Sequence, residues 1–257
     1  MRFRWRQFAQ FIHNCKKFPT RSSLGRPTVV LMLSASGGIS FADEGRCKAN
    51  EAGFGGSGAA KKTPQWEQFY DKGQLRVYRR ILHEGAGIYE YRCEGSYFDI
   101  SPKDFIDAQN DVEYRQKWDS NILSLEILAD DRETNTQLIR WIARFPYPLY
   151  GREYIYERQT TVDDLDKTVV VTSRALDEEE YASSGNYVRV TQYNSTLVVR
   201  AHNDFDQEGF DYTLTYCDNP GGNISSVAYN WMVNTAGPRF LQHVYEAAKE
   251  LKEAQEK

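Results

Sequence analysis

The stretch Gly237-Pro-Arg-Phe-Leu-Gln-His-Val-Tyr-Glu-Ala-Ala-Lys-Glu-Leu251 decides the fold, because it reads as a helix with a single apolar stripe. Gly237 and Pro238 open it, since proline is favoured at the first helical position. Residues at helical spacing share one face, opposite the charges: Leu241, Val244, Tyr245, Ala248 and Leu251. Such a helix must bury its stripe against another layer of structure.

The chain before this helix is rich in strand-like segments separated by turns such as 145–148 and 218–222. They span 75–82, 88–98, 123–128, 137–144, 153–159, 168–175, 188–200 and 209–216. Strands at hairpin spacing predict an antiparallel sheet, and helices at the ends of the series predict an α+β fold. The terminal helix is the expected cover for the concave face of a curved sheet.

Two further helices are predicted. A short one spans Pro64 to Tyr70, with Thr63 as its cap. A clearer one begins at Ser101 and runs to about Trp118.

Two charged residues fall on the inward face of that second helix. At 100° per residue, Arg115 and Asp119 lie within about 80° of the apolar Phe105, Ala108 and Val112. One interpretation is a partly buried structural ion pair. The other is that Arg115 presents its guanidinium to an anion such as phosphate, while Asp119 holds it in place.

Aromatic side chains form a second group of candidates. By strand alternation, Trp141 shares a face with Ala143, and Tyr193 shares one with Ser195, while Tyr154 lies on a third strand. Aromatic residues in strands are usually core residues. Rings that converge would instead form a cage for a quaternary ammonium group. An anion site beside such a cage, under an apolar helix, describes a pocket for a zwitterionic lipid.

Charge divides the 257-residue chain into two unlike parts, although the net charge is only −4. The first 42 residues contain seven basic side chains and no acidic one, whereas the remainder carries 25 basic and 36 acidic side chains. We interpret residues 1–44 as a mitochondrial transit peptide. A basic tail docked on the acidic body is the alternative, and a secretory signal is disfavoured because the apolar stretch 29–42 begins late. Whether that stretch inserts into a membrane stays open.

Residues 45–62 are rich in glycine and alanine and are interpreted as a flexible linker, which leaves residues 63–257 as the folded domain. The acidic body argues against nucleic-acid binding. The cysteines at 15, 47, 93 and 217 have no CxxC spacing, so no metal site is expected, and Cys93 and Cys217 are predicted to be buried reduced thiols. No catalytic motif occurs, and we predict no enzyme activity and no cofactor.

Several motifs resemble those of the START lipid-transfer domain family, and most closely its phosphatidylcholine-transfer branch. They are Glu113-Tyr-Arg-Gln-Lys-Trp-Asp119, Phe145-Pro-Tyr-Pro-Leu-Tyr-Gly-Arg-Glu-Tyr154, Val188-Arg-Val-Thr-Gln-Tyr193, Asp218-Asn-Pro-Gly-Gly222, Asn230-Trp231 and Gly237-Pro-Arg-Phe-Leu241. The resemblance covers about residues 64–252. It implies a helix-grip fold, in which a curved antiparallel sheet and a C-terminal helix enclose one lipid.

The resemblance also implies roles for individual residues. Arg115 would bind the phosphoryl group with Asp119 as its partner, and Trp141, Tyr154 and Tyr193 would form the choline cage. Ala143 and Ser195 stand where the family's phosphatidylcholine carrier has valine and glutamine, so the pocket is expected to be roomier.

The expected function is a monomeric carrier of phosphatidylcholine between membranes. It would touch membrane surfaces transiently and meet the import and processing machinery of mitochondria. The expected location is the intermembrane space or a mitochondrial membrane, with a cytosolic pool left open. The alternatives are a START carrier or sensor for another phospholipid, a sterol or ceramide, and a START-linked thioesterase.

Overall fold

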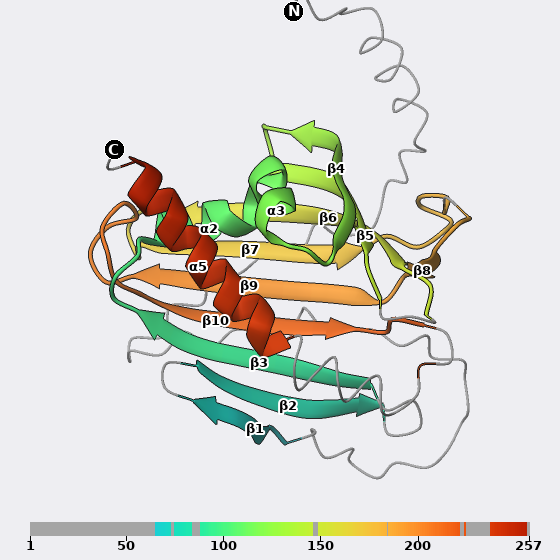
Figure 1. Cartoon of the computed structure of the whole chain (residues 1–257), viewed down its shortest axis with the longest axis horizontal. Helices are drawn as coiled ribbons and strands as arrows, with labels where there is room; N and C mark the ends of the chain where they lie inside the picture. Colours follow the sequence, from blue (N-terminus) through green and yellow to red (C-terminus); the bar gives the residue numbers. More distant parts are fainter. Residues whose placement is uncertain are drawn as a thin grey trace, which may run out of the picture. The chain divides into compact units, whose positions relative to one another are not determined.

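The computed structural model describes residues 65–72, 75–83, 88–145, 149–183, 185–221, 224 and 237–255, which all belong to one compact unit. They form a large sheet, antiparallel except for one short strand, with the helices on one of its faces (Figure 1). The predicted α+β architecture with a covering C-terminal helix is confirmed. The proposed transit peptide and linker lie outside the described residues.

The sheet order is β1-β2-β3-β10-β9-β7-β6-β5-β4, and the short strand β8 pairs in parallel with β6. The first three strands therefore join the rest of the sheet through β10, the last of the strands that the structure describes. The strands are β1 (Glu67–Lys72), β2 (Leu75–His83), β3 (Ile88–Tyr97), β4 (Ile122–Asp131), β5 (Thr136–Ala143), β6 (Arg152–Asp163), β7 (Thr168–Ala175), β8 (Val188–Val190), β9 (Tyr193–Ala201) and β10 (Phe210–Asp218).

The β4–β5 and β6–β7 hairpins close with the same turn chemistry. Asp131 and Asp163 each end a strand, and the side chain of each accepts a hydrogen bond of 2.9 Å from the backbone N–H two residues on. Asn135 and Lys167 then adopt φ of 50° just before the return strand. An aspartate that hydrogen-bonds its own backbone favours a turn, so these residues set where each hairpin reverses.

Three details differ from the sequence predictions. The helix expected over residues 64–70 is wrong, because residues 67–72 pair with β2 as strand β1. The strand expected over residues 188–200 is interrupted, since β8 pairs with β6 whereas β9 pairs with β7 and β10. The helix expected from Ser101 is two helices, α2 (Pro102–Asn110) and α3 (Val112–Trp118).

Asp111 causes the break between α2 and α3. Its backbone is extended, with φ −70° and ψ 106°, so it cannot continue a helix. Its N–H still donates to the carbonyl of Asp107, and its side chain accepts from the N–H of Tyr114 at 2.9 Å. One residue thus caps the end of α2 and the start of α3.

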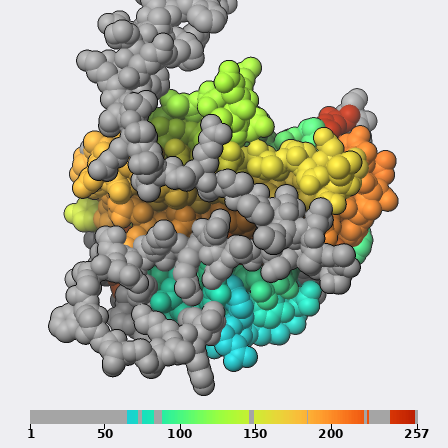
Figure 2. Space-filling model, turned by 180° about the vertical axis from the view of Figure 1, so that it is seen from behind, coloured from blue at the N-terminus to red at the C-terminus, as the bar shows by residue number. Residues whose placement is uncertain are grey.

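Helix α5 (Gly237–Gln255) crosses the sheet on the face that also carries α2 and α3 (Figure 1). Seen from behind, α5, in red, shows only at one edge, in agreement with its place on the opposite face of the sheet (Figure 2). Leu241, Val244 and Ala248 of the predicted stripe are buried against the sheet. Full burial of a leucine or valine side chain contributes roughly 1.5–3 kcal/mol, so the stripe holds the helix in place.

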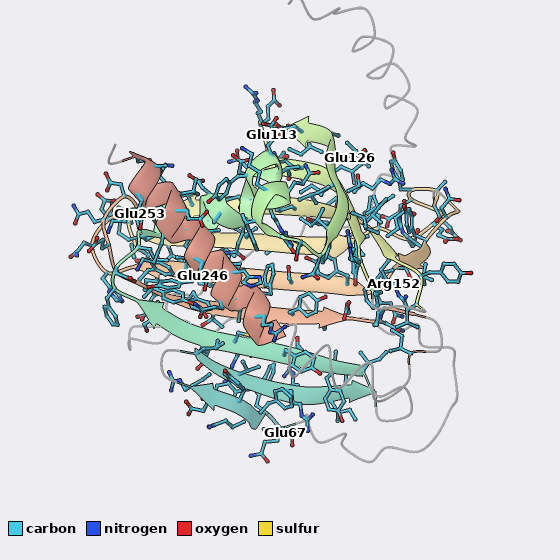
Figure 3. All side chains as sticks on the ribbon, viewed as in Figure 1. Glu67, Glu113, Glu126, Arg152, Glu246 and Glu253 are labelled. Atoms are coloured by element: carbon cyan, nitrogen blue, oxygen red, sulfur yellow. The ribbon has the colours of Figure 1, made fainter. Side chains whose placement is uncertain are left out.

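The outer face of α5 is polar, as the stripe pattern requires. Glu246 and Glu253 are exposed on it, and Glu67, Glu113 and Glu126 are exposed at other parts of the surface (Figure 3). These five acidic side chains are therefore in contact with solvent.

The second half of α5 is also tied by polar contacts to Asp99, in the bend that follows β3. The hydroxyl of Tyr245 donates to the Asp99 carboxylate at 2.6 Å, and Lys249 pairs with the same carboxylate at 3.2 Å. Lys252 donates to the Asp99 carbonyl at 3.1 Å. The first half, with Phe240 and Leu241, instead faces the interior.

Candidate functional site

A cavity of about 510 Å³ lies between the sheet and α5, within the usual size range of small-molecule sites. Its wall has two regions, which we call the apolar end and the polar end. The apolar end consists of Val77, Cys93, Val171, Leu197 and Leu241. The polar end consists of Arg115, Asp119, Trp141, Tyr154, Arg158, Tyr193, Tyr216 and Asp218.

Strand register assembles the aromatic part of the polar end. Trp141 on β5 lies directly opposite Tyr154 on β6, so both rings project from the same face of the sheet. Tyr193 is the first residue of β9, which lies beyond β7 from β6 in the sheet order, and its side chain lies on the same face. Ala143 and Ser195, two residues beyond Trp141 and Tyr193 on their strands, also line the cavity.

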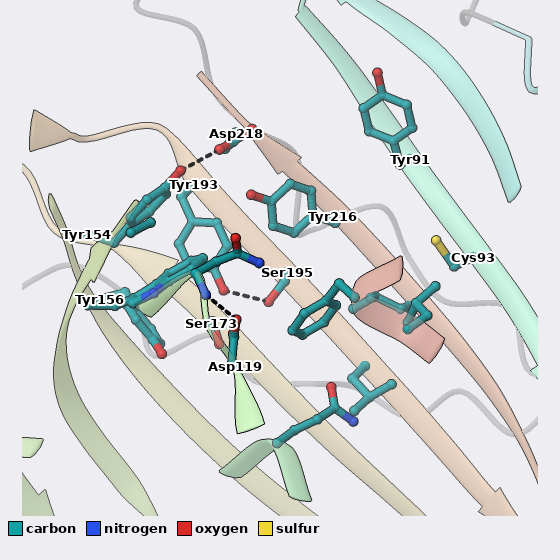
Figure 4. A pocket seen from close by; sticks show the side chains of 18 of the residues that line it. Tyr91, Cys93, Asp119, Tyr154, Tyr156, Ser173, Tyr193, Ser195, Tyr216 and Asp218 are labelled. Carbon is teal, nitrogen blue, oxygen red and sulfur yellow. Dashed lines mark hydrogen bonds between the residues drawn. The ribbon is translucent and has the colours of Figure 1, made fainter. Parts of the chain in front are cut away.

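The three predicted aromatic rings are brought together. Trp141 and Tyr154 stack with centroids 4.6 Å apart and 23° between their planes. Tyr193 meets Tyr154 edge-on at 5.5 Å, and its hydroxyl lies 3.0 Å from the hydroxyl of Ser195 (Figure 4). Stacked and edge-on pairs are favourable aromatic geometries, so the cluster is stable as a wall.

Arg115 and Asp119 lie one turn apart and form an ion pair with 3.5 Å between Nη2 and Oδ2. Asp119 is 4% exposed, and its other carboxylate oxygen accepts the N–H of Asn121 at 3.1 Å. The Arg115 guanidinium lies 5.3 Å from the Trp141 ring and 5.4 Å from the Phe240 ring of α5. The arginine thus bridges α3, the aromatic wall and the covering helix.

Two donors in this region have no partner among the described residues. They are Nε of Arg115 and Nε1 of Trp141, both buried. A buried donor without an acceptor costs roughly 1–3 kcal/mol, so such atoms commonly mark a place where a ligand acceptor binds. An anionic oxygen near Arg115 would satisfy the guanidinium in a geometry that arginine favours.

Arg158 is a second arginine of the polar end, which the sequence predictions missed. It is 6% exposed, and its guanidinium donates to the Asn110 carbonyl at 2.8 Å and to the Gln137 side chain at 2.7 Å. Burial and the nearby charge of Arg115 lower its pKa, although the side chain stays charged. Its donors are largely used within the protein, which makes its role structural.

Asp218 is a second missed residue, at the end of β10. The hydroxyl of Tyr154 donates to its carboxylate at 2.8 Å (Figure 4). Burial raises the pKa of Asp218, whereas hydrogen bonds from Tyr154 and Tyr216 and the charge of Arg152 act in the opposite direction. Burial also raises the pKa of Tyr154 and Tyr216 well above the ordinary tyrosine value, so both phenols are neutral donors.

The apolar end contains a single cysteine, Cys93. Its thiol is free and buried, and burial raises its pKa to about 12, which confirms the predicted inert reduced thiol. Cys217 is also buried, but it is disulfide-bonded, so the prediction of a reduced thiol is wrong for it.

Within the described ranges, no three His, Cys, Asp or Glu side chains gather as metal ligands. No described helix is long and apolar enough to cross a bilayer.

Strand alternation could have revealed both missed residues. Tyr154, Tyr156 and Arg158 alternate along β6, so the face that holds the cage tyrosine also holds the arginine. Tyr216 and Asp218 alternate in the same way on β10. Neither signal shows by itself that the face borders a cavity, because that depends on where α5 packs.

The fold and the pocket together define a START domain. Residues 57–254 match the START domain family, and the chain therefore belongs to it. This confirms the resemblance that the motifs indicate.

Two relatives are similar in sequence to most of this chain. StAR-related lipid transfer protein 7, mitochondrial, of Mus musculus is 38% identical over 199 residues, or 77% of this chain and 53% of that protein. Phosphatidylcholine transfer protein of Mus musculus is 29% identical over 187 residues, or 72% of this chain and 84% of that protein. The chain thus spans about half the length of the first relative.

The solved structure of human STARD10 has the same fold. It superposes with a TM-score of 0.65 at 18% identity, covering 74% of this chain and 76% of that one. Human StAR-related lipid transfer protein 5 superposes with a TM-score of 0.63 at 15% identity, over 75% of this chain and 90% of that chain.

Proposed function

We propose that this chain binds one phosphatidylcholine molecule in the pocket and carries it between membranes, to or within mitochondria. The observation that carries the proposal is the polar end, where Arg115 has an unused buried donor beside the stacked rings of Trp141 and Tyr154. Guanidinium matches phosphate, and aromatic faces attract quaternary ammonium groups. The names of the two relatives support a lipid cargo of this class.

In this proposal the headgroup lies across the polar end. The phosphate contacts Arg115, which Asp119 orients through the ion pair. The choline packs against Trp141, Tyr154 and Tyr193. Ala143 and Ser195 flank the rings with small side chains, which leaves space for the methyl groups.

The acyl chains occupy the apolar end. Each buried methylene contributes about 0.8 kcal/mol, so a long chain gains much by leaving water for Val171, Leu197 and Leu241. That gain is not specific for a headgroup. Headgroup selection therefore belongs to the polar end alone.

Lipid exchange requires the cover to move. The first half of α5 faces the cavity through Phe240 and Leu241, whereas the second half is tied to Asp99. We expect the first half to lift at a membrane surface. The loop at Pro146-Tyr-Pro148, which we also expect to move, lies outside the described residues.

The role is binding rather than catalysis. The described residues that line the cavity include no histidine or lysine that could activate Cys93 or a serine hydroxyl. The polar residues are arranged as a binding surface for charge.

The ligand class is tested by native mass spectrometry of the purified full chain. We expect a complex heavier than the protein by one phosphatidylcholine. A sterol or another lipid as the bound species would overturn the proposal. Transfer of fluorescent phosphatidylcholine from donor to acceptor vesicles, compared with the protein-free rate, tests the carrier activity.

Delivery to mitochondria is proposed to depend on residues 1–44, with residues 45–62 as the linker and 63–257 as the carrier domain. The basic, acid-free composition of the first segment supports this, together with the mitochondrial name of a relative. Changing Arg2, Arg4 and Arg6 together to Glu should leave the protein in the cytosol. The matched control changes the same three residues to Lys and should keep import, as measured by cell fractionation. Import of the Glu variant contradicts the proposal.

A further inference from the structure

Asp218 is a half-buried acid placed among aromatic rings. It lies directly opposite Tyr193 in the register of β10 with β9, and the Tyr154 hydroxyl donates to it at 2.8 Å. Its carboxylate lines the cavity, and no described basic side chain forms a salt bridge with it within 4 Å. A carboxylate that loses much of its hydration without gaining an ion-pair partner is costly, so its place here calls for an explanation.

The groups around Asp218 do not neutralise it. Tyr154 on β6, Tyr193 on β9 and Tyr216 on β10 carry neutral phenols. Among the described residues, the cation that acts on Asp218 is Arg152 on β6, but it forms no salt bridge with the carboxylate, since Nε donates to the Pro220 carbonyl at 2.9 Å and Nη2 to the Gly221 carbonyl at 3.0 Å. Asp218 therefore has no ion-pair partner among the described residues.

We infer that Asp218 supplies the countercharge for the ammonium group of the ligand, and that it acts through Tyr154 to select lipids whose headgroup carries a positive charge. This inference rests on the proposed function. It deepens that proposal, since it makes charge, and not only shape, the property by which the pocket recognises choline.

The order of charges along the polar end supports this assignment. The Arg115 guanidinium lies 5.3 Å from the Trp141 ring, that ring stacks at 4.6 Å on Tyr154, and Tyr154 donates to Asp218 at 2.8 Å. Positive charge, two aromatic rings and negative charge follow one another. A zwitterionic headgroup laid along this series places its phosphate at Arg115 and its ammonium toward Asp218.

Tyr154 gives Asp218 a way to act without touching the ligand. A phenol that donates a hydrogen bond to a carboxylate gains electron density, and the attraction of a cation to a ring grows with the negative charge on its face. Asp218 is thus a positioning residue for Tyr154 and a source of negative potential. A headgroup without a cation would gain neither from the stronger attraction to the ring nor from the negative potential.

The turn after β10 holds this acid in place. Arg152 binds the carbonyls of Pro220 and Gly221, and the Asn219 side chain donates to Gln192 at 3.0 Å. The Asn219 N–H also donates to the Gln192 carbonyl at 2.8 Å. A fixed turn keeps the carboxylate within reach of Tyr154 when the pocket is empty.

The test compares two lipids of nearly identical shape in a vesicle transfer assay with the full chain. One is phosphatidylcholine, and the other, the cation-free lipid, carries 3,3-dimethylbutyl phosphate, in which a carbon replaces the charged nitrogen of choline and only the negative phosphate remains. We expect the unaltered chain to prefer phosphatidylcholine, and Asp218→Asn to reduce that preference by about tenfold, since a cation held in a desolvated aromatic site gains on the order of one decade in affinity. Transfer of the cation-free lipid should not fall.

Two variants support the comparison. Tyr154→Phe keeps the ring, removes its hydrogen bond to Asp218, and should reduce the preference in the same direction by a smaller factor. Asp211→Asn is the matched control, because Asp211 lies on the same strand with an exposed side chain and should change nothing. If Asp218→Asn does not fold, the Tyr154→Phe comparison decides.

The outcomes separate the two proposals. Equal losses for both lipids would make Asp218 merely structural, and an unchanged preference would make it irrelevant to the headgroup, so either result overturns the inference while phosphatidylcholine transfer stands. Failure of the unaltered chain to transfer phosphatidylcholine above the protein-free rate would overturn the proposed function, and the inference with it.

Discussion

Different kinds of interaction stabilise the polar end and the apolar end of the pocket. At the polar end each group depends on particular partners, such as the Arg115–Asp119 ion pair and the Tyr154–Asp218 hydrogen bond. At the apolar end Val171, Leu197 and Leu241 are interchangeable members of one packed cluster. Loss of one partner at the polar end should weaken headgroup recognition, whereas loss of one contact at the apolar end should lower stability without changing what is recognised.

The largest expected effect comes from removing the phosphate partner or the cage wall. Arg115→Ala and Trp141→Ala should each reduce phosphatidylcholine transfer by roughly 100-fold, because a hydrogen bond to a charged group contributes about 1.5–3 kcal/mol and the aromatic contact adds to it. Arg132→Ala, at an exposed turn position, is the matched control and should transfer normally. Normal transfer by both pocket variants would show that lipid recognition does not depend on these partners at the polar end.

A large effect on stability alone is expected at the apolar end. Leu241 is 4% exposed, so Leu241→Ala should lower the free energy of unfolding by about 2–5 kcal/mol, seen as a lower Tm. The preference for phosphatidylcholine over the cation-free lipid should stay the same. Leu165→Ala is the control, since Leu165 is 95% exposed and its truncation should leave the Tm unchanged. A changed headgroup preference in Leu241→Ala would contradict the assignment of headgroup selection to the polar end alone.

A moderate effect is expected from pH. Burial raises the pKa of Asp218 in the empty protein, while a bound ammonium group favours the ionised carboxylate and lowers that pKa. As the pH falls toward the raised pKa, the empty protein takes up a proton that the complex resists, so affinity for choline lipids decreases. Transfer of the cation-free lipid, and transfer by Asp218→Asn, should show no such decline. A parallel decline for both lipids would assign the pH effect to another group.

The smallest effect is expected at Cys93. Its thiol is a neutral buried side chain with a pKa of about 12, so it behaves as a small apolar residue. Cys93→Ala should lower the free energy of unfolding by on the order of 1 kcal/mol, measured by urea denaturation, with transfer and headgroup preference intact. Loss of transfer in this variant would show that the apolar end also contributes a specific contact.

Periodicity in the sequence was enough to predict most of the sheet and the covering helix. The hairpins and α5 could be predicted because their signals are local, as in the stripe through Leu241 and Val244. Strand β1 could not, because its pairing with β2 outweighs a local capping pattern at Thr63 and Pro64. The break at Asp111 was missed because Asp111 does not interrupt the apolar pattern of the helix.

The candidate site was predictable only where a residue was unusual for its face. Arg115 stood out as a charge among apolar helix positions, and the three aromatics were matched by family motif. Asp218 and Arg158 did not stand out, because their importance depends on cross-strand neighbours such as Tyr154 and on the packing of α5. Those relations join residues that are distant in sequence.

Helix α5 is tied to Asp99 through Tyr245 and Lys249, so its first half can tilt about that attachment. Its fixed point is at Tyr245 and Lys249, and the arm from there to Gly237 is roughly 12 Å long at 1.5 Å per residue. A rotation of about 25° about that point moves the tip by roughly 5 Å, which is wide enough for a hydrocarbon chain to pass. In the proposed carrier the cover would therefore open by tilting this one short arm, while the contacts of α5 with Asp99 and the sheet stay in place.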